Sequence, residues 1–145
     1  MDKAEILLIE DDLGWQRELK MSLEVAGYEV SVFATYDSAV NALEQHSAKA
    51  AVVDVSLIPN DASDRQGLLI MKKAHIPIVC VSGYLKPGEV GKLFHKELAG
   101  WFFDKETLWD EEADFLEAVA GAVAKYESES RKKWKKIERS VRTSE

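Results

Sequence analysis

Carboxylates, a hydroxyl and an amine follow successive apolar runs along this chain. Three consecutive acids at 10–12 follow the run ILLI, and Asp54 interrupts the run AAVVDV near its end. Ser82 and Lys105 end or follow two later runs, IVCVS and GWFFD. Clustered carboxylates repel one another unless a cation neutralises them, and a hard, oxygen-lined site suits Mg²⁺. In such a site a carboxylate attacks a phosphoryl group while the cations stabilise its charged oxygens, so these residue types indicate phosphoryl transfer.

Each of these features is weak alone, because acids after a strand are usually solvated. Their weight depends on the elements that position them. Short β-like runs alternate with helical patterns five times, which predicts right-handed crossovers and a parallel sheet with helices on both faces. The carboxyl ends of such strands meet at one edge, where ligands bind. The expected strands are 5–9, 28–33, 50–55, 78–82 and 100–104. Three of the expected helices span 13–26, 67–73 and 110–126. Two more are expected to begin at the capping residues Asp37 and Ser38 and at Pro87 and Gly88.

The composition is that of a globular protein, with 46% hydrophobic and 31% charged residues. No apolar run approaches the roughly 18 residues of a membrane helix, and the N-terminus lacks the pattern of a secretory signal. The single cysteine, Cys80, lies in an apolar run and is expected to be a buried thiol in a reducing compartment. We therefore expect a cytoplasmic protein without a membrane segment.

Charge is distributed unevenly between the body and the C-terminal end. The net charge is −7, yet residues 131–145 carry seven Lys and Arg against two Glu, a surplus of +5 that leaves −12 on residues 1–130. An acidic body does not present the basic face of a nucleic-acid-binding domain, so we expect no direct nucleic-acid binding by it.

The three histidines have no metal-ligand spacing and are interpreted as structural or solvated.

The order acidic pair, Asp, Ser, Lys on a five-fold strand–helix repeat resembles the receiver domain of bacterial response regulators over about residues 4–125. The resemblance implies a flavodoxin-like, doubly wound α/β sheet of order 2-1-3-4-5. It implies a phosphorelay receiver that takes a phosphoryl group from a histidine kinase or phosphotransfer protein with Mg²⁺ as cofactor, and that switches its surface for an output partner. Such a domain is not an enzyme on other substrates, since it catalyses only its own phosphorylation and dephosphorylation. The domain is placed at 1–125 and a basic helical extension or linker at 126–145.

The resemblance also assigns a role to individual residues. Asp54 is the phosphoacceptor, Ser82 bonds the phosphoryl group and Lys105 pairs with it. Phe102 matches the aromatic residue whose rotamer follows the movement of Ser82. The Mg²⁺ ligands are Glu10 (largely through water), Asp11, Asp54 and the backbone carbonyl of Ser56. Ser56 and Tyr84 border the path of the hydrolytic water and set the lifetime of the phosphorylated state, with the bulk of Tyr84 expected to slow hydrolysis.

Departures from the family pattern leave alternatives open. Glu106 stands where the family places a proline in a cis bond after the lysine, and the loop between Asp54 and Gly67 is long. One alternative is a pseudo-receiver that binds partners without phosphorylation. The other is a phosphatase of the haloacid-dehalogenase type, although that class needs a second Asp two residues after the nucleophile, where Ser56 stands.

The C-terminal end keeps helical spacing beyond the body. Trp134, Ile137 and Val141 form an apolar stripe, so we expect residues 126–141 to continue the last helix. Such a stripe needs a surface, and the candidates are its own domain, a second copy in a homodimer, or an output partner. We expect self-association or partner contact; the alternative is a solvated end.

Overall fold

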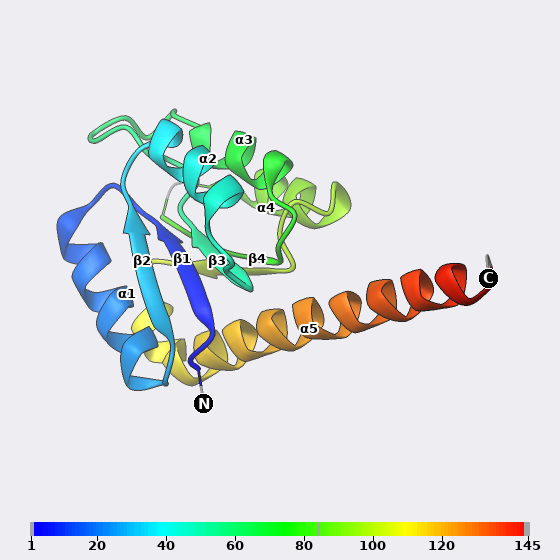
Figure 1. Cartoon of the computed structure of the whole chain (residues 1–145). Coiled ribbons are helices and arrows are strands. Elements are labelled where there is room, and N and C mark those ends of the chain that lie inside the picture. Colours follow the sequence, from blue (N-terminus) through cyan, green and yellow to red (C-terminus); the bar gives the residue numbers. More distant parts are fainter. Residues whose placement is uncertain (1, 84, 144–145) are drawn as a thin grey trace.

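Strands and helices alternate regularly through the chain (Figure 1). The structure is a computed structural model and describes residues 2–83 and 85–143. The strands are β1 (Glu5–Ile9), β2 (Glu29–Phe33), β3 (Ala50–Val53), β4 (Ile78–Ser82) and β5 (Trp101–Asp104). The helices are α1 (Leu13–Val25), α2 (Tyr36–Gln45), α3 (Gln66–Lys73), α4 (Pro87–His95), the 3₁₀ turn η1 (Leu108–Glu111) and α5 (Glu112–Thr143).

The five strands form one parallel sheet in the order β2-β1-β3-β4-β5, which confirms the predicted fold class. Figure 1 shows α1 and α5 on one face and α2, α3 and α4 on the other. Alternate residues of β1 therefore enter two different cores: Leu7 and Ile9 pack on the α2–α4 side, and Ile6 and Leu8 on the α1–α5 side. Burial on both faces explains why the central strands are continuously apolar.

Strand register brings the candidate residues to one edge of the sheet. Ile9 pairs with Val53, and the Asp54 N–H donates to the Ile9 carbonyl at 2.9 Å, so the residues that follow β1 and β3 are neighbours. At the other side of β3, the Lys105 N–H donates to the Ser82 carbonyl at 3.2 Å. Because the strand order reverses between β1 and β3, this edge is the switch point at which such sheets bind ligands.

Several predicted element boundaries are wrong in detail. The strand expected at 50–55 ends at Val53, because the chain turns there toward α3. The caps expected for α2 are also wrong, because the N-cap is Thr35. The Thr35 hydroxyl accepts the Ser38 N–H at 3.2 Å, and Ser38 Oγ accepts the Thr35 N–H in return. Asp37 lies inside the first turn of α2, where its charge favours the helix dipole.

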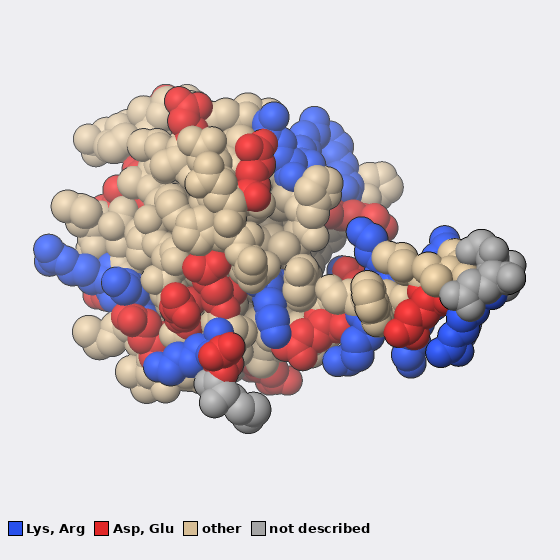
Figure 2. Space-filling model, viewed as in Figure 1, with Lys and Arg blue, Asp and Glu red and all other residues tan. Residues whose placement is uncertain are grey.

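Helix α5 is 32 residues long and continues well beyond the sheet that its first half covers. This confirms the predicted helical continuation through residues 126–141. Figure 1 shows its second half projecting from the body, and Figure 2 shows that Lys and Arg gather along it. The extension does not dock on its own domain, because every described side chain from 129 to 142 is exposed. None of the described helices is long and apolar enough to cross a membrane.

Candidate functional site

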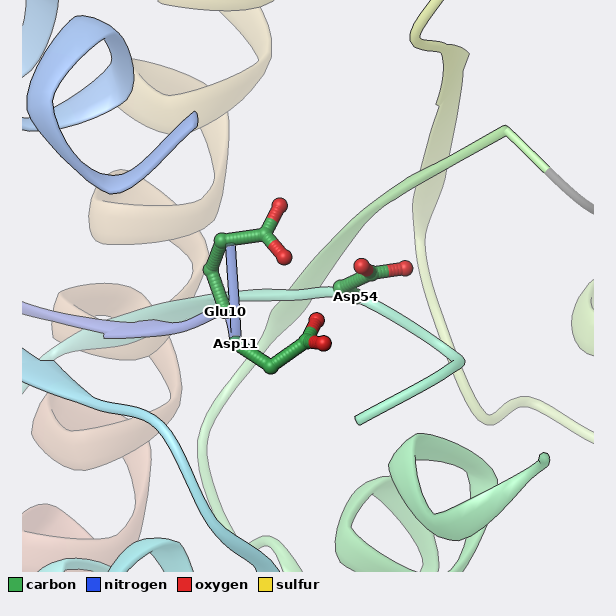
Figure 3. Close-up of side chains that lie close together, drawn as sticks. All are labelled: Glu10, Asp11 and Asp54. Atoms are coloured by element: carbon green, nitrogen blue, oxygen red, sulfur yellow. The ribbon is translucent and has the colours of Figure 1, made fainter. Parts of the chain in front are cut away.

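Three carboxylates converge where β1 and β3 end. Glu10, Asp11 and Asp54 each offer an oxygen, and these oxygens all lie within 4.8 Å of one another. Figure 3 shows the three side chains turned toward a common space. Glu10 and Asp54 are only 1% and 4% exposed, whereas Asp11 is half-buried and faces a cavity of about 600 Å³. The predicted acidic group is therefore present, and it is a set of hard oxygen donors that could hold a divalent cation.

Lys105 supplies positive charge to this group. Its Nζ lies 2.9 Å from Asp54 Oδ2, to which it donates a hydrogen bond, and 2.5 Å from Glu10 Oε1. The second contact is ionic and poorly directed, because Glu10 Oε1 accepts no well-oriented hydrogen bond from the described residues and is fully buried. Burial acts against the charged ammonium, but Asp54 and Glu10 outweigh it and raise the pKa of Lys105. The lysine therefore stays charged between two buried carboxyl groups.

Glu10 has a strongly shifted proton affinity. Burial and, next, the charge of Asp54 raise its pKa to about 9, against a smaller opposing effect of Lys105. A carboxyl with this pKa holds a proton at neutral pH when no other cation is present. Glu10 Oε1 accepts no well-directed hydrogen bond, and the pKa of Glu10 is raised. Both features indicate that this group could accommodate a further cation, such as a metal ion.

Asp12 is not part of the cluster. Its Oδ1 accepts the Trp15 N–H at 2.9 Å and caps the start of α1. The Gln16 side chain, which the sequence reasoning did not single out, donates to the Glu10 carbonyl at 2.7 Å and fixes the end of β1. Trp15 lies with its ring centroid 5.0 Å from Lys105 Nζ, close enough for a cation–π contact, and stacks on Trp109.

Hydrogen bonds within the long loop after Asp54 hold its two ends together. Ser56 N–H lies 3.4 Å from Asp54 Oδ1, while the Ser56 hydroxyl donates to the Asp64 carbonyl at 2.8 Å. Asp64 Oδ2 in turn accepts the Leu57 N–H at 2.8 Å. The hydroxyl of Ser56 is thus engaged within the loop. Its predicted effect on phosphoryl lifetime stays a prediction, and Tyr84 lies outside the described residues.

A salt bridge that the sequence did not reveal ties this loop to α4. Arg65 Nε and Nη2 donate to the two oxygens of Glu89 at 2.8 and 3.1 Å. The pair raises the pKa of Arg65 and lowers that of Glu89, chiefly through this hydrogen bonding. Opposite charges 24 residues apart give no local signal, so only the folded chain shows that the two residues meet.

The other predicted residues lie near the site on β4 and β5. Ser82 is fully buried at the end of β4, and its neighbour Cys80 is also buried, which raises the pKa of the thiol and keeps it protonated. Phe102 is half-buried on β5 and packs against the core on the α2–α4 side. Both positions fit the predicted switch pair, and the rotamer change itself stays a prediction.

Comparison with known proteins finds resemblance in structure only. No family model and no curated protein matches the sequence. A CheY-like response regulator receiver domain from Methanospirillum hungatei JF-1 superposes with a TM-score of 0.73 at 23% identity, covering 88% of this chain and 99% of that one. The signal receiver domain of an HD domain-containing protein from Pseudomonas fluorescens Pf-5 gives 0.72 at 17% identity, with the same coverage. A receiver domain of a putative Luxo repressor protein from Vibrio parahaemolyticus gives 0.72 at 15%, covering 89% and 96%.

This chain has the receiver-domain fold. Its sheet order and size are those of a single CheY-like receiver domain. The turn after β5 departs from the family pattern that the sequence resembles, because no cis peptide bond occurs within residues 2–83 and 85–143. The Lys105–Glu106 bond is therefore trans. Asp104 Oδ1 accepts the Glu106 N–H at 2.8 Å, a contact that a proline at this position would lack.

Proposed function

We propose that this receiver accepts a phosphoryl group on Asp54 from a histidine kinase or phosphotransfer protein, and that the modification switches a surface read by an output partner. The observation that carries the proposal is the position of Asp54. It is a nearly buried carboxylate, 2.9 Å from a lysine ammonium and grouped with two more acids, at the ligand-binding edge of a receiver fold. A partner kinase of this class would place the receiver in the cytoplasm.

The residues present divide the reaction between them. An Asp54 oxygen attacks the phosphorus atom as the bond from phosphorus to the donor breaks, and the donor leaves with its bonding electrons. Lys105, already within hydrogen-bonding distance of Asp54, follows the incoming phosphoryl group and pairs with its oxygens. Ser82, at the end of the adjacent strand, provides the hydroxyl for a further phosphoryl oxygen. The receiver catalyses only its own phosphorylation and dephosphorylation.

The acidic group fits Mg²⁺, which would be held by Glu10, Asp11, Asp54 and the Ser56 carbonyl. The donor set is all oxygen, and it includes a buried carboxylate oxygen without a well-directed partner among the described residues. When bound, Mg²⁺ would neutralise charge on the phosphoryl oxygens. The chain's own task is to hold these carboxyl groups together, which Lys105 does by contacting both Glu10 and Asp54.

Phosphoryl uptake separates the proposal from its alternatives. The full chain is incubated with acetyl phosphate and Mg²⁺, and its intact mass is followed together with phosphate release. A receiver gains one phosphoryl group per chain and loses it slowly. A pseudo-receiver gains none, and a phosphatase of the haloacid-dehalogenase type turns over phosphomonoesters steadily. Either of the last two results would contradict the proposal.

Asp11 and Asp12 are expected to differ sharply as metal ligands. Asp11→Asn removes a carboxylate from the cluster and should weaken Mg²⁺ binding about tenfold or more. Asp12→Asn should leave binding within about twofold, because asparagine caps a helix as well as aspartate does. Titration is followed by tryptophan fluorescence, since Trp15 contacts Lys105 beside the site. A larger loss for Asp12→Asn would show that the acidic pair is shifted by one residue.

Mg²⁺ affinity is also expected to rise with pH. The pKa of Glu10 is about 9 in the folded protein, above its ordinary value of 4.5. Between pH 4.5 and pH 9, Glu10 therefore holds a proton in the folded, metal-free protein but not in the unfolded chain. That proton stabilises the metal-free fold below pH 4.5, and its contribution is lost as the pH rises through about 9. A cation that needs the ionised carboxylate must displace the proton, so the Kd should fall by up to about tenfold per pH unit between pH 6 and 8.

Glu10→Gln is the control for this pH dependence, because it removes the titrating group while keeping its shape. Isothermal titration at pH 6, 7 and 8 compares the two proteins. We expect a sloping Kd for the wild type and a nearly level one for the variant. A level Kd in the wild type would mean that Glu10 is already ionised in the metal-free protein.

A further inference from the structure

The projecting half of α5 carries large apolar side chains in water. Trp134, Ile137 and Val141 are 62%, 46% and 54% exposed, and their spacing of three and four residues places them on one side of the helix. Burying such side chains stabilises a protein, and a helix that extends into solvent gains none of this stabilisation. The exposed apolar stripe therefore indicates a binding surface for another protein chain.

The stripe follows a seven-residue repeat that begins inside the body. Writing the heptad as abcdefg, position d is taken by Leu116, Val123, Ser130 and Ile137, and position a by Ala120, Glu127, Trp134 and Val141. Apolar residues at a and d, alternating three and four apart, are the pattern of a coiled coil. Glu127 interrupts it, but its carboxylate already pairs with Lys49 of the body at 3.0 Å. Ser130 is small enough for two helices to approach closely.

The same side of α5 is also apolar where the helix crosses the body. Leu116 lines a cavity of about 440 Å³ between α1 and α5, together with Met21, Val25 and Trp109. Met21 and Val25 are 66% and 85% exposed. Because Leu116 and Ile137 share the d position, the apolar face of the body continues into the stripe on the extension. A partner that covers one can cover the other.

The extension carries a net positive charge, but the charges that flank its stripe fit a second copy in parallel. Position g is Lys133 and position e is Glu138, and in a parallel pair the g residue of each helix faces the e residue five positions on in the other. Two opposite-charge pairs therefore form across the dimer. Of the other cations, Arg131 occupies an e position beside the seam, opposite the uncharged Tyr126 at g. The rest lie at the outer positions b, c and f: Lys132, Lys135, Lys136, Arg139 and Arg142. In Figure 2 the blue Lys and Arg side chains of the extension are interrupted by red acids.

We propose that α5 is a dimerisation helix: two copies of this chain pair in parallel along residues 116–141, the extensions forming a short two-stranded coiled coil. The proposal does not depend on phosphorylation. A coiled coil of so few heptads is weakly stable alone, because short helices are marginal in water. We therefore expect contact between the α1–α5 faces of the two bodies to stabilise the dimer further. The arrangement brings the two receivers side by side with their C-termini together.

Cysteine cross-linking tests the seam directly. Ser130→Cys puts a thiol at a d position, where the same residue of the second copy faces it, whereas Ser128→Cys puts one at the outer b position. The native Cys80 is buried and does not compete. Under mild oxidation of the full chain, we expect a covalent dimer for Ser130→Cys and mostly monomer for Ser128→Cys. Equal cross-linking of both variants, or none for Ser130→Cys, would overturn the proposal.

Charge exchange tests the parallel direction. In sedimentation equilibrium, Lys133→Glu and Glu138→Lys should each raise the dimer dissociation constant about tenfold, and the combined exchange should restore it. Lys132→Glu, which makes the same charge change at an outer position, should have little effect. Failure of the combined exchange to restore pairing would exclude the parallel register. A wild type that stays monomeric at all concentrations, whether or not it binds anionic vesicles or an acidic protein, would also overturn the proposal.

Discussion

Lys105→Met is expected to destabilise the metal-free protein by about 2–3 kcal/mol at pH 7.5 and to abolish stable phosphorylation. The ammonium lies between the carboxyl groups of Glu10 and Asp54, and all three are largely buried. Removing one member of a buried ion pair typically costs about 3–5 kcal/mol. Because the raised pKa of Glu10 lets that group hold a proton, the cost falls mainly on Asp54 and the total is smaller.

The size of this effect should depend on both pH and Mg²⁺. Urea denaturation at pH 7.5 and pH 5 should show a smaller loss at the lower pH, where proton uptake relieves the carboxylates. Mg²⁺ should stabilise the variant more than the wild type, because the divalent cation no longer competes with an ammonium. Lys20→Met, on the exposed face of α1, is the matched control and should change stability little. If Lys105→Met is as stable as this control without Mg²⁺, Lys105 does not neutralise the cluster.

Gly67→Ala is expected to lower the free energy of unfolding by about 3–5 kcal/mol. A Cβ at Gly67 would lie 2.1 Å from the Asp54 carbonyl oxygen and 2.6 Å from Val55 Cα, both backbone atoms that cannot rotate away. The Gly67 N–H also donates to the Val55 carbonyl at 2.8 Å, so the first turn of α3 is held against the end of β3. The added methyl group must separate the two and displace Asp54.

Gly91→Ala provides the comparison for this substitution. Gly91 lies within α4, and a Cβ there meets no atom within 4 Å. The change should therefore stabilise the protein by about 0.5–1 kcal/mol through helix propensity. Chemical denaturation of both variants measures the difference. Similar stability for the two variants would mean that α3 moves freely relative to Asp54, which would contradict the close packing at this site.

The residues that follow the strands could be predicted because the relevant pattern is local. Continuous apolar runs predict strands buried on both faces, and alternation with helices predicts that their carboxyl ends meet. Glu10, Asp54, Ser82 and Lys105 are therefore expected at one edge from the sequence alone. The role of Asp12 as a helix cap follows equally well from its position before an amphipathic segment.

Contacts between distant segments could not be predicted in this way. The bond between Arg65 and Glu89 and the closure of the loop through Asp64 depend on how the chain returns after Asp54, which no periodicity encodes. The sequence predicts a start of α2 that is too late, because Asp37 and Ser38 are both good capping residues. The choice of Thr35 as the cap depends on where β2 ends.

The residue that carries the phosphoryl group can be mapped directly. The full chain and its Asp54→Asn variant are treated with acetyl phosphate and Mg²⁺, the acyl phosphate is trapped by borohydride reduction, and peptides are sequenced by mass spectrometry. We expect a single modified residue, Asp54, in the wild type and no incorporation in the variant, which should still bind Mg²⁺ through Glu10 and Asp11. Undiminished incorporation in Asp54→Asn, or none in a folded, Mg²⁺-binding wild type, would contradict the account.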